Sequence, residues 1–197
     1  MRPKKRVAVL ISGRGSNMEA LIAACRAEDF PAEIIGVLSN KADAKGLETA
    51  AQAGIAALAI PHRDFADRER HDAAMHEALT RLNPDIVALA GYMRLMTGPF
   101  VDKWRGKMIN IHPSLLPDFK GTHTHERALA AGVAEHGCTV HFVTPGMDEG
   151  PVIAQARVPV LPGDTPDLLS ARVLVAEHKL YPRALAMVAR GEAVFSR

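Results

Sequence analysis

The sequence predicts an α/β fold with a single doubly wound, mostly parallel sheet and an antiparallel strand towards the C-terminal part. In the first 111 residues, short apolar runs alternate with helical segments, which is typical of βαβ units with right-handed crossovers. Residues 138–143 instead alternate polar and apolar side chains, as a strand with one wet face does. The short turn at 145–150 can only return the chain antiparallel.

The individual elements follow from runs of apolar residues and from the glycines and prolines that bound them. Residues 7–11 are continuously apolar, which indicates a strand buried on both faces. The expected strands are 7–11, 33–39, 55–60, 84–90, 107–111, 138–143 and 151–160. The expected helices are 18–24, 45–53, 63–82, a short one that Thr97 can cap, 126–131, and 166–190 with a kink at Pro182.

The composition is that of an ordinary globular protein. The 197 residues are 48% hydrophobic and 23% charged, and we expect them to form one domain. The net charge of only +2 gives no argument for a nucleic acid or membrane partner. The sequence leaves open whether the chain is a monomer or a homodimer.

Cysteine content and the lengths of the apolar runs favour a cytoplasmic location. Cys25 and Cys138 lie far apart without C-x-x-C spacing, so we expect two free thiols in a reducing compartment. The first apolar run is too short for a signal peptide, and no run approaches the roughly 18 residues of a membrane span.

The turn at residues 12–17, Ser-Gly-Arg-Gly-Ser-Asn, is a candidate anion site. It lies between a buried strand and a helix, where backbone N–H groups at the helix N-terminus are available to an anion. We expect Ser16 to be the N-cap and Glu19 to complete a capping box. The turn is neither G-x-G-x-x-G nor Walker A, so a single phosphate monoester fits better than a dinucleotide or ATP. The alternative is a tight turn that binds nothing.

A candidate catalytic pair lies at the end of the strand 107–111. Asn110 and His112 are two residues apart, so on an extended backbone they project to the same face. An amide donor beside an imidazole is suited to holding a developing oxyanion. The alternative is a hydrogen-bonded pair that closes a surface turn.

Asp148 is the candidate third member of this group. If the strand at 138–143 adjoins the strand at 107–111, the carboxylate can reach His112, favour the imidazolium and make it a general acid. The alternative is that Asp148 merely serves the turn 146–150.

Other chemistries find less support in the residues. His123, His125, His136 and His141 with Asp148 lack H-E-x-x-H spacing and spread over a loop, a turn and a strand, so we expect no metal. Ser114 is not in a nucleophile elbow, and nothing marks Cys138 as activated, so we expect no covalent intermediate. The charges of the helix 63–82 are mostly those of a solvated face.

Three strings make the chain resemble the glycinamide ribonucleotide formyltransferases, folate-dependent enzymes of purine synthesis with a Rossmann-like formyltransferase fold. The strings are ISGRGSN, INIHPSLLPDFKGTHTHERAL and HGCTVHFVTPGMDEGPVIAQA, and the likeness runs from about residue 7 to residue 181. The signature N-x-H-P-S-L-L-P with a downstream Asp is shared with methionyl-tRNA formyltransferase and formyltetrahydrofolate deformylase. The Gly-Arg-Gly-Ser-Asn loop separates this family from those two.

The resemblance implies a reaction. The formyl group of 10-formyltetrahydrofolate, a co-substrate, passes to the amine of glycinamide ribonucleotide, giving N-formylglycinamide ribonucleotide and tetrahydrofolate without a metal. It also implies one formyltransferase domain over residues 1–197, with a ribonucleotide-binding N-terminal half and a folate-binding, catalytic C-terminal half.

The same resemblance assigns residues to each part of the site. Matching the catalytic trio are Asn110, His112 and Asp148. Matching the ribonucleotide site are Gly15, Ser16, Asn17 and Glu177. Matching the folate site are Arg68, Met93, Arg94, Leu95, Met96, Asn110, Thr144, Pro145, Gly146, Met147 and Asp148.

Two alternative functions remain open at the level of sequence. The chain could be another enzyme that uses 10-formyltetrahydrofolate, although the tRNA enzyme would be expected to carry a further C-terminal domain and the deformylase an N-terminal regulatory one. It could also be a non-catalytic phosphate-binding module, since this fold class alone permits one. A sensor has no need of an oxyanion donor, which argues against the second alternative.

Overall fold

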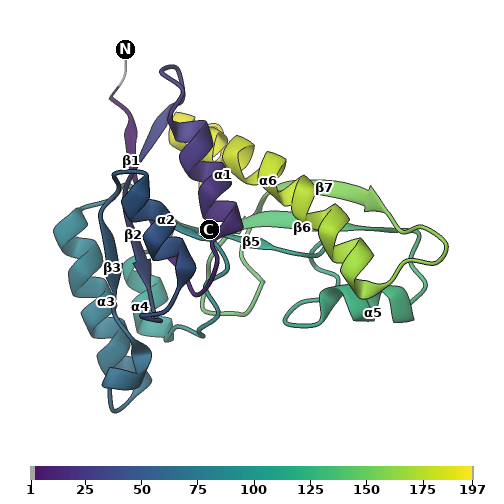
Figure 1. The fold of residues 1–197 in the computed structure, drawn as a ribbon, viewed down its shortest axis with the longest axis horizontal. Coiled ribbons are helices and arrows are strands. Elements are labelled where there is room, and N and C mark those ends of the chain that lie inside the picture. Colours follow the sequence, from purple (N-terminus) through teal and green to yellow (C-terminus); the bar gives the residue numbers. More distant parts are fainter. Residues whose placement is uncertain (1–2, 197) are drawn as a thin grey trace.

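The computed structural model describes residues 3–196, and across these residues the chain forms one seven-stranded sheet in the order β3-β2-β1-β4-β5-β6-β7 (Figure 1). The strands are β1 (Lys5–Ile11), β2 (Ala32–Ser39), β3 (Ala57–Ala59), β4 (Ile86–Leu89), β5 (Met108–His112), β6 (Glu135–Phe142) and β7 (Val152–Pro159). All neighbours are parallel except that β6 runs antiparallel to both β5 and β7. The predicted fold class is confirmed.

The helices cover both faces of this sheet. They are α1 (Ser16–Cys25), α2 (Lys45–Gln52), α3 (Arg68–Leu82), α4 (Gly98–Lys103), α5 (Thr124–Ala130) and α6 (Pro166–Arg190), with a 3-10 turn at His62–Asp64. The N-terminal half of the chain, with β1–β4, forms one end of the molecule. The C-terminal half forms a long arm in which β6 and β7 lie between α5 and α6 (Figure 1).

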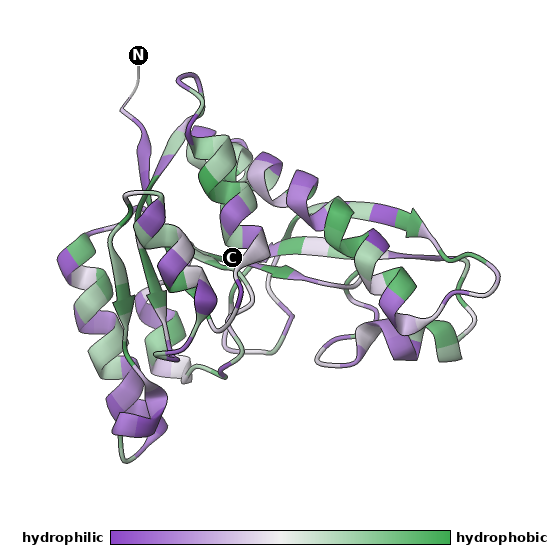
Figure 2. Cartoon of the chain, viewed as in Figure 1, coloured by the Kyte–Doolittle hydropathy of each residue, from purple (hydrophilic) through white to green (hydrophobic). Residues whose placement is uncertain are grey.

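Two hydrophobic cores result, one on each face. Val7, Val9 and Ile11 of β1 face a core shared with α1 and α6, whereas Ala8 and Leu10 face a core shared with α3 and α4. The alternation explains why β1 is apolar at every position. Figure 2 shows hydrophobic strands in the interior and hydrophilic bands along the outer helices, particularly on α3. None of the helices in residues 3–196 has the length and hydropathy needed to cross a membrane.

Helix α3 begins later than the sequence predicted. The expected start at residue 63 is wrong, because residues 62–64 form a separate 3-10 turn and Phe65 is extended. Asp67 then caps α3 by accepting a hydrogen bond of 2.8 Å from the Arg70 N–H.

The predicted capping box on α1 is also wrong. The helix starts at Ser16 itself, its N-cap is Gly15 at φ +76°, and within the described chain no side chain caps it. The Glu19 N–H donates to the Gly15 carbonyl instead, at 2.9 Å. Glycine is favoured at this left-handed position, which turns the chain sharply into the helix. The Ser16 hydroxyl is therefore not used as a cap, and the first-turn N–H groups lack helical acceptors.

Strand β6 does not have the wet face that its alternating pattern predicted. Every residue of β6 after Glu135 is buried. The loop after β5 folds back over the polar side, where the Thr139 hydroxyl donates to the Ser114 carbonyl (2.7 Å) and accepts from the Leu116 N–H (3.0 Å). The polar residues of β6 therefore face protein groups rather than solvent.

One of these residues makes folding stability depend on pH. His136 is only 1% exposed, and within residues 3–196 neither ring nitrogen has a hydrogen-bond partner. Burial, with repulsion from His125 and His112, lowers the pKa of His136 to about 4. Between pH 6.5 and 4 the unfolded chain binds a proton that the folded chain does not, so stability falls as the pH falls.

We therefore expect His136→Phe, which keeps an aromatic ring, to flatten the acid side of the stability profile. Urea unfolding at pH 7 and pH 5 should show that the parent protein loses about 2 kcal/mol more than the variant over this interval. Parallel profiles for the two proteins would contradict the assignment.

Candidate active site

The topology places a crevice at the carboxyl ends of β1 and β4. These strands are adjacent and parallel, but α1 after β1 and α4 after β4 pack on opposite faces, which makes this the switch point of the sheet. A cavity of about 300 Å³ lies there, lined by residues 12–17, Lys41, Ala90, Gly91 and Met93. Gly15, Ser16 and Asn17 thus lie where open α/β sheets bind ligands.

A larger cavity of about 660 Å³ adjoins the first and shares Asn17, Gly91 and Met93 with it. Of the predicted residues, those lining the larger cavity are Asn17, Met93, Arg94, Leu95, Asn110, His112, Met147, Asp148 and Glu177. Within residues 3–196, those that line neither cavity are Arg68, Met96, Thr144, Pro145 and Gly146. Arg68 is exposed at the first position of α3.

His112 and Asp148 meet in the larger cavity. The His112 Nδ1 lies 3.4 Å from the Asp148 Oδ2, and both side chains are largely buried. Asp148 has φ +53°, and its Oδ2 accepts a hydrogen bond of 2.9 Å from the Gly121 N–H. The turn thus presents the carboxylate to the imidazole and ties it to the loop after β5.

The second nitrogen of His112 also faces an acceptor. Its Nε2 lies 2.9 Å from the Phe119 carbonyl oxygen. Since a carboxylate and a carbonyl can only accept, protons on both ring nitrogens satisfy both contacts. The surroundings therefore suit an imidazolium.

His141 orients the amide of Asn110, a role that the sequence interpretation missed. Asn110 and His141 are directly paired across β5 and β6, with the Asn110 Nδ2 3.3 Å from the His141 Nε2. The His141 Nδ1–H donates to the Phe142 carbonyl at 2.9 Å. Burial lowers the pKa of His141, which keeps the ring neutral and its Nε2 an acceptor for the amide. The sequence analysis considered His141 only as part of a metal site, which the residue spacing did not favour.

Glu177 and Asn17 form a second polar pair at the junction of the two cavities. The Asn17 Nδ2 donates to the Glu177 Oε2 at 2.8 Å, which joins the start of α1 to α6. Burial raises the pKa of Glu177 despite this hydrogen bond. One turn later, the buried Tyr181 hydroxyl donates to the Leu89 carbonyl at 2.7 Å and anchors α6 to the sheet. Glu177 is thereby held at the carboxyl edge of the strands.

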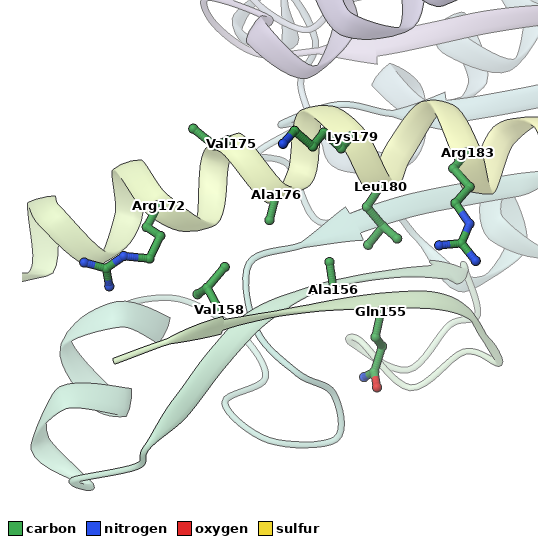
Figure 3. A pocket seen from close by; sticks show the side chains of 9 residues that line it. All are labelled: Gln155, Ala156, Val158, Arg172, Val175, Ala176, Lys179, Leu180 and Arg183. Atoms are coloured by element: carbon green, nitrogen blue, oxygen red, sulfur yellow. The ribbon is translucent and has the colours of Figure 1, made fainter. Parts of the chain in front are cut away.

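A groove elsewhere on the molecule does not compete with this site. A groove of about 470 Å³ between α6 and β7 is lined by Ala156 and Val158 with Arg172, Lys179 and Arg183 (Figure 3). None of the predicted functional residues lines it. Among residues 3–196 there is also no group of three or more His, Cys, Asp or Glu side chains that could hold a metal ion.

Comparison with known proteins identifies the family of the chain. Residues 5–185 match a family model described as formyl transferase, so the chain belongs to the formyl transferase family. Its relatives include the phosphoribosylglycinamide formyltransferase of Escherichia coli strain K12, which is 48% identical over 185 residues, covering 94% of this chain and 87% of the relative. The solved phosphoribosylglycinamide formyltransferase from Brucella melitensis is 56% identical, covers 98% of this chain and 100% of its own, and superimposes with a TM-score of 0.91.

Similar sequences also occur inside much longer proteins. The human trifunctional purine biosynthetic protein adenosine-3 is 53% identical over 190 residues, which are 96% of this chain. This chain spans only 19% of that relative, and 14% of the corresponding protein of Drosophila pseudoobscura. The relatives that this chain spans over most of their length, from Escherichia coli and Brucella melitensis, both carry the name phosphoribosylglycinamide formyltransferase.

Proposed function

We propose that the chain transfers the formyl group of 10-formyltetrahydrofolate to the amine of glycinamide ribonucleotide, giving N-formylglycinamide ribonucleotide and tetrahydrofolate. One observation carries this proposal. Asn110, His112 and Asp148 line one cavity, and that cavity adjoins the candidate anion-binding turn at residues 12–17. The names of the relatives support the acceptor. The formyl donor is inferred from the family resemblance.

The two substrates are assigned to the two adjoining cavities. The ribonucleotide phosphate binds at Gly15, Ser16 and Asn17, where first-turn N–H groups favour an anion. Glu177 holds the ribonucleotide beside Asn17. The folate lies in the larger cavity, against Met93, Arg94 and Leu95 on one side and Met147 and Asp148 on the other. Residues 1–197 then form one formyltransferase domain, with the ribonucleotide bound mainly by its N-terminal half and catalysis in its C-terminal half.

In the proposed mechanism the glycinamide amine attacks the formyl carbon. The resulting oxyanion accepts hydrogen bonds from the Asn110 amide and the His112 imidazolium. Because His112 Nδ1 faces Asp148, the donor must be Nε2–H, which exchanges the Phe119 carbonyl for the oxyanion. The attacking amine loses a proton, the carbon–nitrogen bond to the folate breaks, and the folate nitrogen gains a proton as tetrahydrofolate leaves.

The proposed setting is the reducing cytoplasm. Cys25 and Cys138 are free thiols in the described part of the chain, and burial raises the pKa of each to about 12, so neither is a reactive thiolate at neutral pH. The proposed partners are the two small-molecule substrates, glycinamide ribonucleotide and 10-formyltetrahydrofolate.

A spectroscopic assay for tetrahydrofolate tests the proposal. The protein is incubated with 10-formyltetrahydrofolate, with and without glycinamide ribonucleotide. We expect product only with the acceptor. Product formed equally without acceptor would indicate a deformylase, and no product in either reaction would indicate a binding module.

A further inference from the structure

The segment from Gly91 to Thr97 connects β4 to α4 and forms one wall of the larger cavity. It has neither helical nor strand structure, and it begins with Gly91 at φ +73°. Met93 is 72% exposed and Leu95 is 52% exposed, so apolar packing does little to fix these two side chains. Tyr92 and Met96 pack against the core on the α3 side, and hydrogen bonds fix the backbone beside the exposed side chains, at Met93 and Thr97.

The first anchor of the segment is Ser12, at the end of β1. The Met93 N–H donates to the Ser12 Oγ at 2.7 Å. The Ser12 hydroxyl in turn donates to the Asn40 Oδ1 at 2.5 Å, and both of these residues are buried. The same serine precedes the turn 13–17, so one side chain joins the walls of the two cavities.

The second anchor is Asp72, on α3. The Thr97 N–H donates to the Asp72 Oδ2 at 2.8 Å. Asp72 is 3% exposed, and its Oδ1 lies 3.7 Å from the Nδ1 of the fully buried His71. The His71 Nε2 is 2.9 Å from the Ile60 carbonyl, which fixes the ring. Neither cavity includes Asp72 among its lining residues in the described chain.

A buried carboxylate is costly unless hydrogen bonds compensate for lost hydration. Burial alone would raise the pKa of Asp72, but interactions with His71 and Thr97 outweigh burial and hold the pKa below its ordinary value. The side chain is therefore ionised at neutral pH. A hydrogen bond to a charged acceptor is stronger than one to a neutral acceptor.

We propose that Asp72, together with Ser12, is a positioning residue. The two residues fix the segment from Gly91 to Thr97, which lines the cavity proposed for the formyl donor, and so set the affinity for that donor. The inference rests on the proposed function for the identity of that donor. Asp72 also stands in as a cap for the short helix α4, because in the described structure Thr97 makes no side-chain cap bond. A cap alone would affect stability, whereas a positioning residue also affects donor binding.

The test compares three variants. Asp72→Ala removes the anchor. Asp72→Asn keeps an oxygen for the Thr97 N–H and turns its amide towards the His71 Nδ1, so it should restore part of the anchor without the charge. Asp67→Ala is the matched control, because it removes a carboxylate cap from the same helix without touching the segment.

We expect Asp72→Ala to raise the KM for 10-formyltetrahydrofolate about tenfold or more, the loss typical of one charged hydrogen bond. The kcat and the KM for glycinamide ribonucleotide should change by less than about twofold, because Asp72 lines neither cavity. Hydrogen exchange at the Thr97 amide should accelerate. Asp72→Asn should give a donor KM between those of the parent protein and Asp72→Ala, because its neutral oxygen still accepts from the Thr97 N–H. Asp67→Ala should lose stability without a change in donor KM.

Three kinetic results would overturn the inference. One is an unchanged donor KM in Asp72→Ala, and another is an equal increase in both KM values. The third is a donor KM that rises as much in Asp67→Ala. If the parent protein shows no formyl transfer, the proposed function fails, and calorimetric titration with tetrahydrofolate then decides separately whether Asp72→Ala weakens folate binding. A parent protein that binds no tetrahydrofolate overturns the inference as well.

Discussion

His112→Ala is expected to lower kcat by about 10²–10³ while both KM values change little, because an oxyanion donor acts mainly in the transition state. The ring sits between Asp148 and the Phe119 carbonyl, so its removal deletes both the charge and the donor. Steady-state kinetics with each substrate varied in turn measures the effect. His76→Ala is a suitable control, since His76 packs its ring edgewise against Trp104 away from both cavities.

A kcat close to normal in His112→Ala would contradict the assignment of His112 as an oxyanion donor. A further check uses Asp148→Asn, which keeps the shape of the side chain but removes the charge that favours the imidazolium. If the two residues act as a unit, the double variant should lose little more than the more damaged single variant. Fully additive losses would show that the carboxylate acts independently of the ring.

The sequence was sufficient for the features that depend on local order. The alternation of strands and helices predicted the sheet, and the spacing of Asn110 and His112 placed both on one side of β5. The turn at 12–17 was recognised as a helix entry, although the capping chemistry was wrong. There, a glycine with positive φ replaced the side-chain cap that Ser16 and Glu19 suggested.

The features that sequence could not provide depend on contacts between distant segments. His141 orients Asn110 only because the register of β5 and β6 pairs these two residues. Asp72 reaches Thr97 only because α3 and α4 pack on the same face. The polar pattern of β6 indicated solvent, but it reflects a loop that folds over the strand. In each case the residue type was visible and its partner was not.

Gly150→Ala is expected to cause the largest loss of stability, about 3 kcal/mol, because the backbone at Gly150 leaves no space for a side chain. A Cβ atom there would lie 1.6 Å from the Phe142 carbonyl oxygen, and the adjacent Phe142 N–H is hydrogen-bonded to the Pro151 carbonyl at 2.9 Å. The turn between β6 and β7 must therefore move. We expect Tm to fall by roughly 6–12 °C in thermal unfolding.

The same substitution should also reduce kcat, since Asp148 lies two residues before Gly150 and its carboxylate contacts His112 through the geometry of this turn. Gly98→Ala is the matched control, because its Cβ would meet nothing nearer than the Pro145 Cβ at 3.9 Å, an ordinary contact. Equal Tm values for Gly150→Ala and Gly98→Ala would show that the turn can yield without cost. A lower Tm with an unchanged kcat would show that Asp148 keeps its place beside His112 independently of the turn.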